Sequence, residues 1–411
     1  QSSFVGGSPV VYLISGSADV FVQELRLVSE LDGPLQYVAG VYYEDVDYVS
    51  LAPLYATGDL SINALGTPFG STNPLVNEQL QGRSLEQLAF YGEISYNLTE
   101  NLTLTGGVRR YDYERNAITF LEGVLGSVDE NTTTDDQGTN IKVNLSYSPR
   151  EDTLIYAQVA EGFRPGNANP PPPKNLCDVN DDGILDGTNA PIRNGFDADT
   201  TKNFELGTKL SLLDNRLQVN AALYRVDWEG IPLNVAPGKL PSQPEKICFS
   251  NTIVNAGEAR AEGLEIETIY QVSEGLRVTL GGAYTNVELT EDALSLNALD
   301  GDRLPSSPDY SVNLGLQYEF EVKGGYPSYI RSDYAYVSEF FPLLGEVGEK
   351  GGGYGQLNMS AGVSLNDINL ELFVNNLTDE DAITSVGILI PDSRAYRLKP
   401  RTIGLSVGYD F

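Results

Sequence analysis

Apolar and polar residues alternate along several long stretches of the chain. In Tyr310–Val322 the even-numbered residues are aromatic or aliphatic, whereas the odd-numbered residues are Ser, Asn, Gly, Gln and Glu. Leu357–Leu365 and Thr402–Phe411 show the same alternation, with the apolar residues at odd numbers. Successive side chains of a β-strand point to opposite faces, so this period of two predicts strands with one apolar and one polar face. Each stretch has roughly the 9–11 residues with which a tilted strand crosses a bilayer.

The alternation predicts fifteen strands, and the connections between them are alternately short turns and long loops. The expected strand cores are 19–29, 35–48, 85–98, 102–115, 139–149, 153–163, 201–213, 217–229, 261–273, 276–289, 309–322, 328–340, 354–366, 368–378 and 400–411. The long loops lie near 49–84, 116–138, 164–200, 230–260, 290–308, 341–353 and 379–399. Short turns at one rim and long loops at the other are typical of outer-membrane barrels.

The polar face of these strands indicates the fold class. It carries Glu, Gln, Asn, Ser and Gly, and strands of a soluble sandwich are usually shorter, at about five or six residues. The sequence therefore predicts an all-β fold, an antiparallel up-and-down transmembrane β-barrel with about 15 strands present. The alternation changes phase after Val108, where Arg109 and Arg110 adjoin. We expect a bulge or the end of the membrane zone there.

Several segments, taken together and in order, resemble the barrel domain of the TonB-dependent outer-membrane receptors. These segments are Phe21–Leu27, Asp32–Pro34, Tyr37–Gly40, Ala160–Gly166, Asn203–Gly207, Asn255–Gly257, Glu262–Glu265, Phe373–Asp379, Arg401–Gly404 and Tyr409–Phe411. The last pair of aromatic residues, Tyr409 and Phe411, also looks like the assembly signal at the C-terminus of outer-membrane proteins.

The resemblance implies a 22-strand barrel that follows a plug domain and a TonB-contacting segment. Neither the plug nor the TonB segment is visible in the sequence, so we expect a partial barrel. Counting back from Phe411, residues 1–18 are expected to be the remainder of an external loop, and 19–411 the partial barrel domain. The resemblance implies a bacterial outer-membrane location, contact with its lipid, and contact with the TonB complex through the missing plug. It also implies uptake of a scarce small-molecule ligand, such as a ferric siderophore. A chain without the plug is not expected to transport by itself.

Composition excludes several functions. The chain has 26 Lys and Arg against 57 Asp and Glu, which gives a net charge of −31, and it has no His. A nucleic-acid-binding protein needs a basic surface for the phosphates, so no nucleic-acid partner is expected. The missing His removes the Ser-His-Asp triad and His-ligated zinc or haem, so no enzyme is expected and direct haem capture is disfavoured.

The segment Cys177–Asp186 resembles a calcium-binding loop in its spacing. Asp178, Asn180 and Asp182 occupy positions 1, 3 and 5, and Gly183 provides the sharp turn at position 6. The main-chain carbonyl of Ile184 and the carboxylate of Asp186 would complete most of the oxygen set, with Asp197 or Asp199 in place of the usual Glu. The alternative is an acidic, solvated loop held by Asx-turns. Calcium is the one cofactor that the sequence suggests.

Cys177 and Cys248 lie in consecutive long loops on the same rim and are the two cysteines of the chain. An exposed rim is an oxidising environment, so we predict a disulfide between them, with two free thiols as the alternative.

Aromatic residues gather near the ends of the expected strands. We interpret most of them as interfacial girdles, and a minority as residues that face a ligand. The set comprises Tyr42, Tyr43, Tyr48, Tyr111, Tyr113, Tyr224, Trp228, Tyr334 and Tyr336.

Two other functions remain open at this point. A passive outer-membrane porin would show the same alternation with its own constriction, and a soluble, calcium-stabilised secreted β protein would use the acidic loop for stability. The ligand itself is not readable from the sequence.

Overall fold

The alternating segments form long antiparallel strands in the computed structural model of the chain. The structure describes residues 2–5, 8–56, 75–123, 126–169, 172, 177–235, 239–240, 243–247, 252–344, 346, 348–389 and 392–410. Among these residues no helix is long and apolar enough to cross a membrane. The longest helical element within them is one short 3₁₀ turn, Leu294–Leu296.

Fifteen long strands follow one another across the sheet in the order of the sequence, within the described ranges. They are β3 (Ser15–Val28), β4 (Leu35–Leu51), β6 (Leu75–Thr99), β7 (Leu102–Gly123), β8 (Gly126–Arg150), β9 (Thr153–Arg164), β12 (Asp199–Leu212), β13 (Leu217–Glu229), β18 (Glu258–Gln271), β19 (Leu276–Leu289), β20 (Tyr310–Val322), β21 (Tyr326–Val337), β22 (Tyr354–Leu365), β23 (Ile368–Asn375) and β26 (Thr402–Tyr409). Each of the fifteen predicted cores overlaps one of these strands, so the all-β, up-and-down architecture is confirmed.

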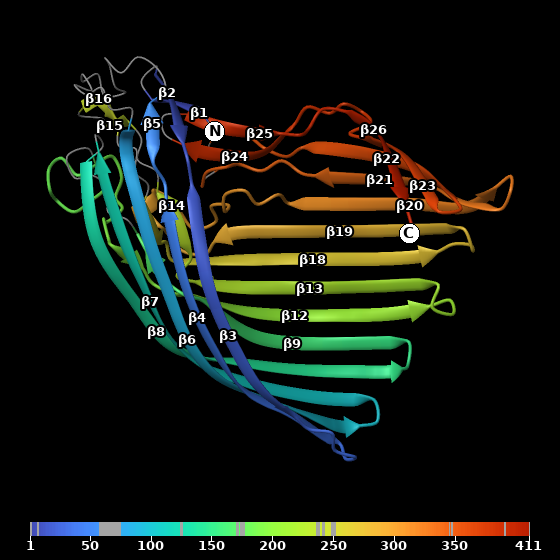
Figure 1. The fold of residues 1–411 in the computed structure, drawn as a ribbon. Helices are drawn as coiled ribbons and strands as arrows, with labels where there is room; N and C mark the ends of the chain where they lie inside the picture. Colours follow the sequence, from blue (N-terminus) through green and yellow to red (C-terminus); the bar gives the residue numbers. More distant parts are fainter. Residues whose placement is uncertain are drawn as a thin grey trace.

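Every long strand pairs in antiparallel fashion with the next. The sheet curves into an arch, with the short turns at one rim and the long loops at the other (Figure 1). Among the described residues β3 pairs with β4 alone and β26 with β23 alone. The arch therefore has two long unpaired edges.

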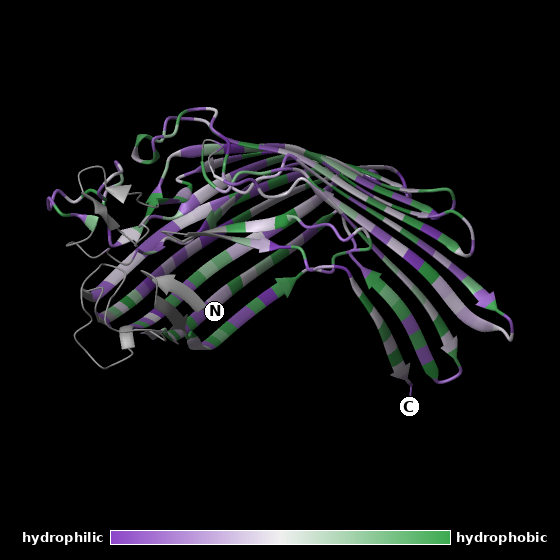
Figure 2. Cartoon of the chain, turned by 90° about the horizontal axis from the view of Figure 1, so that it is seen from above, coloured by the Kyte–Doolittle hydropathy of each residue, from purple (hydrophilic) through white to green (hydrophobic). Residues whose placement is uncertain are grey.

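The convex face of the arch is apolar and uncovered. Val143 is 48% exposed, Leu316 42% and Leu405 67%, although all three lie in the middle of long strands. Alternating polar and apolar bands run along the strands of the single sheet (Figure 2). Within the described residues no second sheet or helix packs against these side chains, which fits a face that lipid covers.

The concave face is polar, and aromatic rings fill it where neighbouring strands carry glycine. Lys142 Nζ on β8 reaches Glu93 Oε2 on β6 at 3.1 Å, above Gly107 of the intervening β7. Tyr91 lies over Gly40 of the adjacent strand, so a Cβ at that glycine would collide with the ring. The same pairing recurs for Tyr111 and Gly138, Tyr156 and Gly207, Tyr224 and Gly263, Tyr329 and Gly362, and Phe373 and Gly404. Such pairs restore the packing that glycine lacks in a strand.

Strands β6, β7 and β8 extend well beyond their predicted cores and sweep past their neighbours toward the long-loop rim (Figure 1). The predicted bulge at Arg109 and Arg110 is wrong, because β7 pairs with both neighbours there without a register shift. The alternation changes because the convex-face residues after Val108 are polar, beginning with Arg110 and Asp112. The second alternative, the end of the apolar zone, accounts for the pattern.

Short strands lie within the long-loop segments. They are β1 (Ser2–Val5), β2 (Ser8–Tyr12), β5 (Leu54–Ala56), β10 (Asn167–Ala168), β11 (Gly195–Phe196), β14 (Pro232–Val235), β15 (Lys239–Leu240), β16 (Gln243–Ile247), β17 (Thr252–Asn255), β24 (Ile383–Leu389) and β25 (Asp392–Arg397). The segment 1–18, expected as the remainder of an external loop, contains the β1–β2 hairpin and the beginning of β3.

A charge on the convex face should destabilise the chain in lipid. We expect Val143→Arg to lower the free energy of unfolding from lipid vesicles by about 2–4 kcal/mol, because the guanidinium would be forced into hydrocarbon. Asn144→Arg is the matched control, since the neighbouring side chain points to the polar concave face, and its cost should stay below about 1 kcal/mol. Urea titration of both variants in vesicles measures the difference. Equal losses would contradict the assignment of the two faces.

Candidate functional site

Three long-loop segments pack together at one rim of the arch and form a cap. We define the loop cap as the described residues of 165–198, 230–257 and 290–309. One buried cluster joins Cys177, Leu185, Val235 and Val254 from the first two segments. A second buried cluster, which includes Ile231, Ala256, Leu289 and Ala298, joins the second and third segments. Leu296 packs against both clusters, so the three segments share a continuous apolar interior.

Buried amide side chains hold the segments of the loop cap in register. Asn169 is 2% exposed, and its Nδ2 donates to Thr252 Oγ1 at 2.7 Å and to the carbonyl of Ile253 at 2.8 Å. The backbone N–H of Ile253 donates back to Asn169 Oδ1 at 3.0 Å. Asn189, which is exposed, adds a surface contact, in which its Nδ2 donates across to the carbonyl of Leu294 at 3.2 Å. The bonds of Asn169 satisfy buried polar groups, and both residues fix the mutual position of the loops.

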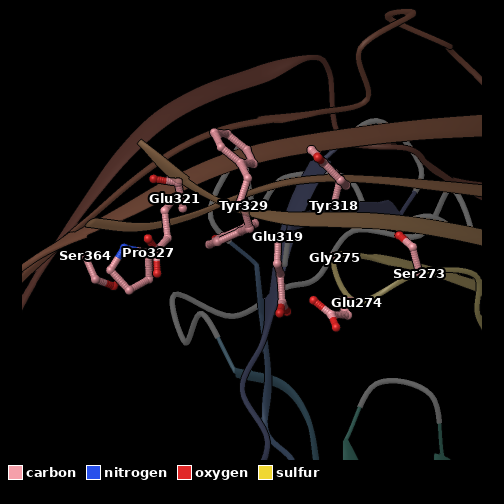
Figure 3. A pocket seen from close by; sticks show the side chains of 11 residues that line it. Ser273, Glu274, Gly275, Tyr318, Glu319, Glu321, Pro327, Tyr329 and Ser364 are labelled. Atoms are coloured by element: carbon pink, nitrogen blue, oxygen red, sulfur yellow. The ribbon is translucent and has the colours of Figure 1, made fainter. Parts of the chain in front are cut away.

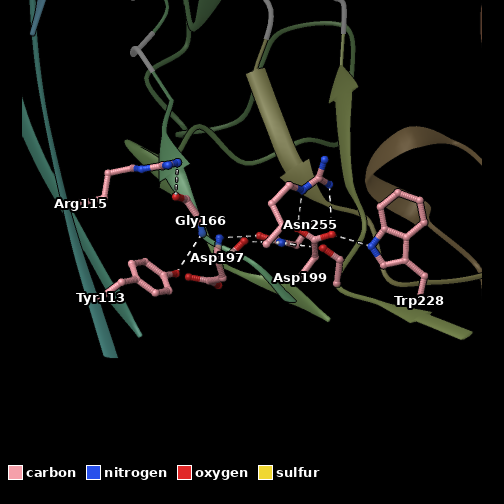
Figure 4. A network of polar contacts seen from close by, with 9 residues as sticks. Tyr113, Arg115, Gly166, Asp197, Asp199, Trp228 and Asn255 are labelled. Carbon is pink, nitrogen blue, oxygen red and sulfur yellow. Dashed lines mark hydrogen bonds and ion pairs between the residues drawn. The ribbon is translucent and has the colours of Figure 1, made fainter. Parts of the chain in front are cut away.

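A buried carboxylate orients an arginine where the loop cap meets the sheet. Asp199, at the start of β12, is 3% exposed. Its two carboxylate oxygens accept hydrogen bonds from Arg164 Nε at 2.8 Å and Arg164 Nη2 at 3.1 Å, at the end of β9 (Figure 4). Trp228 Nε1 donates to Asp199 Oδ2 at 2.6 Å, and the guanidinium of Arg164 lies 5.6 Å from the indole ring. This bidentate pair leaves the arginine side chain 56% exposed on the concave face.

The chain after Arg164 is pinned to β7, the strand on the far side of β8 from β9. The backbone N–H of Gly166 donates to the hydroxyl of Tyr113 at 3.0 Å, and Arg115 Nη1 donates to the carbonyl of Gly166 at 3.0 Å (Figure 4). Phe163 stacks on Tyr111 with ring centroids 3.4 Å apart and an interplanar angle of 4°. On the other side of the network, Asn255 Oδ1 accepts from the backbone N–H of Asp197 at 2.9 Å. The base of the loop cap is therefore fixed to β7, and Asn255 ties its first segment to its second.

A hollow of about 800 Å³ lies on the concave face below these contacts. Its wall carries charges of both signs, since Arg26, Arg109, Arg115 and Lys142 line it together with Glu24, Glu44, Glu93 and Glu161. Arg109 lies over the ring of Tyr42 at 5.3 Å, and its buried Nε has no hydrogen-bond partner among the described residues. This arrangement can accept an anionic, partly aromatic ligand.

A second hollow, of about 810 Å³, lies at the opposite rim, among the short turns (Figure 3). Glu274, Glu319 and Glu321 line it, and Gln317 Nε2 donates to Glu319 Oε1 at 2.7 Å. The length of the strands separates this hollow from the loop cap. Its carboxylates fit a hydrated wall, and we assign it no ligand.

The predicted calcium residues lie together in one turn, but their carboxylates bind the main chain. Asp178 Oδ1 accepts from the backbone N–H of Asp182 at 2.9 Å, and Asp178 Oδ2 accepts from that of Gly183 at 3.2 Å. Asp182 Oδ1 accepts from the N–H of Ile184 at 2.8 Å. These are the contacts of a loop held by Asx-turns, the alternative reading of the sequence.

The remaining members of the predicted calcium set have other partners. Asn180 Nδ2 donates to Asp182 Oδ2 at 2.8 Å, and Asp186 Oδ2 accepts from the N–H of Val179 at 2.9 Å. Asp199, considered as an additional ligand, binds Arg164 instead. In the part of the chain that the structure describes, no group of three or more His, Cys, Asp or Glu side chains is placed to hold a metal ion. Calcium binding thus stays a prediction without structural support.

Cys177 is completely buried in the loop cap. Cys248, its predicted partner, lies outside the described residues. Of the predicted assembly signal, Tyr409 ends β26 with its ring exposed, and Phe411 also lies outside the described residues.

The girdle interpretation of the aromatic residues needs correction. Strand alternation and pairing place six of the nine on the concave face and three on the convex face. The concave residues are Tyr42, Tyr48, Tyr111, Tyr113, Tyr224 and Trp228. The convex residues are Tyr43, Tyr334 and Tyr336.

Sequence reasoning missed the network around Asp199. Arg164 belongs to the Ala160–Gly166 segment and Asp199 shortly precedes the Asn203–Gly207 segment, both of which carried the family resemblance. The strands of these two segments pair, and Arg164 lies directly opposite Asp199 in the ladder. The sequence signal that could have revealed the network is therefore a charged residue in or next to each of the two segments.

Comparison with known proteins places the chain in a family. Residues 7–377 match the family model described as TonB dependent receptor-like, beta-barrel. The chain is 24% identical over 330 residues to the pesticin receptor of Yersinia pestis, covering 79% of this chain and 44% of that protein. It is 21% identical over 348 residues to the probable TonB-dependent siderophore receptor PiuA of Acinetobacter baumannii, covering 79% of this chain and 42% of that protein.

A solved structure shows the same fold. The ferric yersiniabactin uptake receptor FyuA from Yersinia pestis superposes with a TM-score of 0.76 and 20% sequence identity, over 98% of this chain and 55% of that one. The chain spans less than half the length of the two curated relatives. From the family match and the shared arch of strands, the chain belongs to the TonB-dependent receptor-like β-barrel family.

Proposed function

We propose that the chain is the barrel part of an outer-membrane receptor that takes up a ferric siderophore with energy from TonB. The observation that carries the proposal is the family match together with the names of the relatives, which describe a siderophore receptor and a ferric yersiniabactin uptake receptor. The uncovered apolar face supports contact with outer-membrane lipid. Family membership favours this receptor over the passive porin and over the soluble calcium-stabilised protein.

The open edges of the arch support a partial barrel. An unpaired strand edge exposes a row of N–H and C=O groups, which cannot remain unsatisfied in hydrocarbon. We propose that further strands of a longer protein join β3 to β26, and that a plug domain within the closed barrel contacts TonB. In this proposal the polar concave face surrounds the plug and the ligand.

The positive groups near the loop cap support an anionic ligand. The chain is strongly acidic overall, whereas the wall of the hollow carries cationic and carboxylate side chains in equal number. Arg164 is held in position by Asp199 and Trp228 yet exposes its guanidinium, and Arg109, Arg115 and Lys142 line the hollow below. Iron chelators of siderophore type bind the metal through anionic oxygens, and these side chains can donate hydrogen bonds to such oxygens.

Cells that express the complete receptor gene should take up iron in a TonB-dependent way. With radioactive iron bound to a panel of catecholate, phenolate and hydroxamate siderophores, we expect uptake of at least one chelate and its loss in a strain without TonB. Arg164→Gln should weaken binding of that chelate by about tenfold, because about 1.4 kcal/mol is the scale of one charge-assisted contact. Arg225→Gln, on the convex face, is the matched control and should change binding less than about twofold. Uptake that does not need TonB would instead indicate a passive pore.

We propose that Cys177 and Cys248 form the disulfide that ties two segments of the loop cap. Treated with an alkylating reagent without reductant, the denatured chain should gain no alkyl group, and after reduction it should gain two, one per cysteine. The variant Cys248→Ser should leave Cys177 reactive, because its partner is gone. Mass spectrometry reads both results. Two alkyl groups on the chain that was never reduced would refute the bridge.

A further inference from the structure

Four neighbouring strands continue beyond the apolar band of the convex face. We call this extension the wing, and define it as Asp45–Leu51 of β4, Leu80–Glu86 of β6, Glu114–Phe120 of β7 and Asp129–Asp135 of β8. The wing is the part of the sheet that sweeps toward the long-loop rim (Figure 1). Its strands remain paired through their whole length, so its convex face is a regular surface.

The wing lies beyond the zone that hydrocarbon can cover. On β6 the convex apolar residues run from Leu98 to Leu88. At about 3.3 Å per residue and a tilt of about 40°, this stretch rises about 25 Å, which is the height of the apolar band in outer-membrane barrels. Glu86 is the next convex residue on the strand. The carboxylate therefore marks the end of the band, and the wing projects into water.

A row of four carboxylates crosses the base of the wing. Asp45 is paired with Glu86, Glu86 with Glu114, and Glu114 with Asp135, each directly opposite the next. Glu86 Oε1 accepts from the hydroxyl of Tyr43 at 3.1 Å, and Glu114 Oε1 accepts from Asn116 Nδ2 at 3.0 Å. Within the described residues none of the four has an ion-pair partner. Like charges directly opposite each other destabilise a sheet, and in the part of the chain that the structure describes no ion pair offsets that cost.

An apolar patch lies immediately above this row on the same face. Val49 is 49% exposed, Ile118 51% and Phe120 37%. Gly82 separates Val49 from Ile118 in the ladder and carries no side chain to fill the space between them. Leu80, 41% exposed, is paired with Phe120. An apolar patch bordered by unpaired charges, in water, is characteristic of a protein-binding surface.

We propose that the convex face of the wing is a docking surface for a cationic protein that places apolar side chains against Val49, Ile118 and Phe120. Charge complementarity selects this occupant. Lys or Arg side chains of the partner would neutralise the carboxylate row, while its apolar residues cover the patch. A second copy of this chain does not fit, since it also carries a net charge of −31. The inference goes beyond ligand uptake, because it concerns the opposite face of the sheet from the ligand hollow.

A labelled peptide of alternating Leu and Lys is the probe, and the matching Leu and Glu peptide is its control. Binding to the full chain in detergent is followed by fluorescence anisotropy at low salt. We expect the cationic peptide alone to bind, and the double variant Glu86→Gln and Glu114→Gln to weaken its binding by about tenfold. Ile118→Thr, which keeps a β-branched side chain in the strand, should weaken it by about fivefold through lost apolar contact. The circular dichroism spectrum of each variant must match that of the parent chain, so that weaker binding does not reflect loss of the fold.

The matched control removes two carboxylates from the convex face elsewhere. Glu262 on β18 lies beside Arg225, and Glu288 on β19 is paired with Arg260. Because these carboxylates already have cationic neighbours, the double variant Glu262→Gln and Glu288→Gln should change peptide binding less than about twofold. Equal loss in both double variants would overturn the proposal, because the peptide would then sense net charge alone. A second outcome would also overturn the proposal. In it, the double variant Glu86→Gln and Glu114→Gln still binds the peptide but no longer adsorbs to anionic phospholipid vesicles in the presence of calcium. The wing would then be a lipid contact. Neither result depends on siderophore uptake.

Discussion

The antiparallel hydrogen-bond ladder from β3 to β26 is the constraint on which the rest of the structure depends. The inner long strands, β4 to β23, satisfy their backbone groups through two neighbours, whereas β3 and β26 have one each, and no second layer packs on the sheet within the described residues. A single sheet of this kind is stable where lipid covers one face, because hydrocarbon offers no partner to an unpaired N–H or C=O. The apolar convex face and the polar concave face follow from the period of two in the sequence.

The ladder also determines where specific chemistry can lie. A uniform sheet positions its loops but does not pack against them, so the loop cap has its own buried clusters and its own amide hydrogen bonds. The pairing of β9 with β12 then brings Arg164 opposite Asp199, where a buried carboxylate can hold an exposed guanidinium. The candidate ligand site is thus built from residues at strand ends, which the ladder places and the loop cap completes.

Much of the fold was predictable from the sequence, because alternation survives wherever one face of a strand is apolar and the other is polar. The fifteen strand cores and the order of their connections followed from that pattern. It failed in the extensions of β6, β7 and β8 beyond the predicted cores, where convex residues such as Ser84, Asn116 and Asp135 are polar. Beyond the apolar band both faces meet water, so the chain can continue as a strand without an alternating signal.

The candidate site was less predictable, because its contacts join distant segments. The spacing of Asp178, Asn180 and Asp182 suits a cation, but it equally suits carboxylates that accept main-chain N–H groups, which is what the structure shows. Asp199 was considered as a calcium ligand, whereas its partners Arg164 and Trp228 come from two other strands. The aromatic residues were assigned mainly to girdles, although counting along each strand from a known convex residue would have placed Tyr111 and Tyr224 on the concave face.

The central claim is that lipid, and no other protein layer, covers the convex face. Spin labels placed singly along Ser311–Val322 of the chain in lipid vesicles test it most directly, with oxygen and a water-soluble nickel complex as relaxing agents. The account predicts that even positions such as 312, 314 and 316 are accessible to oxygen, and that the odd positions between them are accessible to nickel. Accessibility without a period of two, or even positions exposed to the nickel complex, would contradict it.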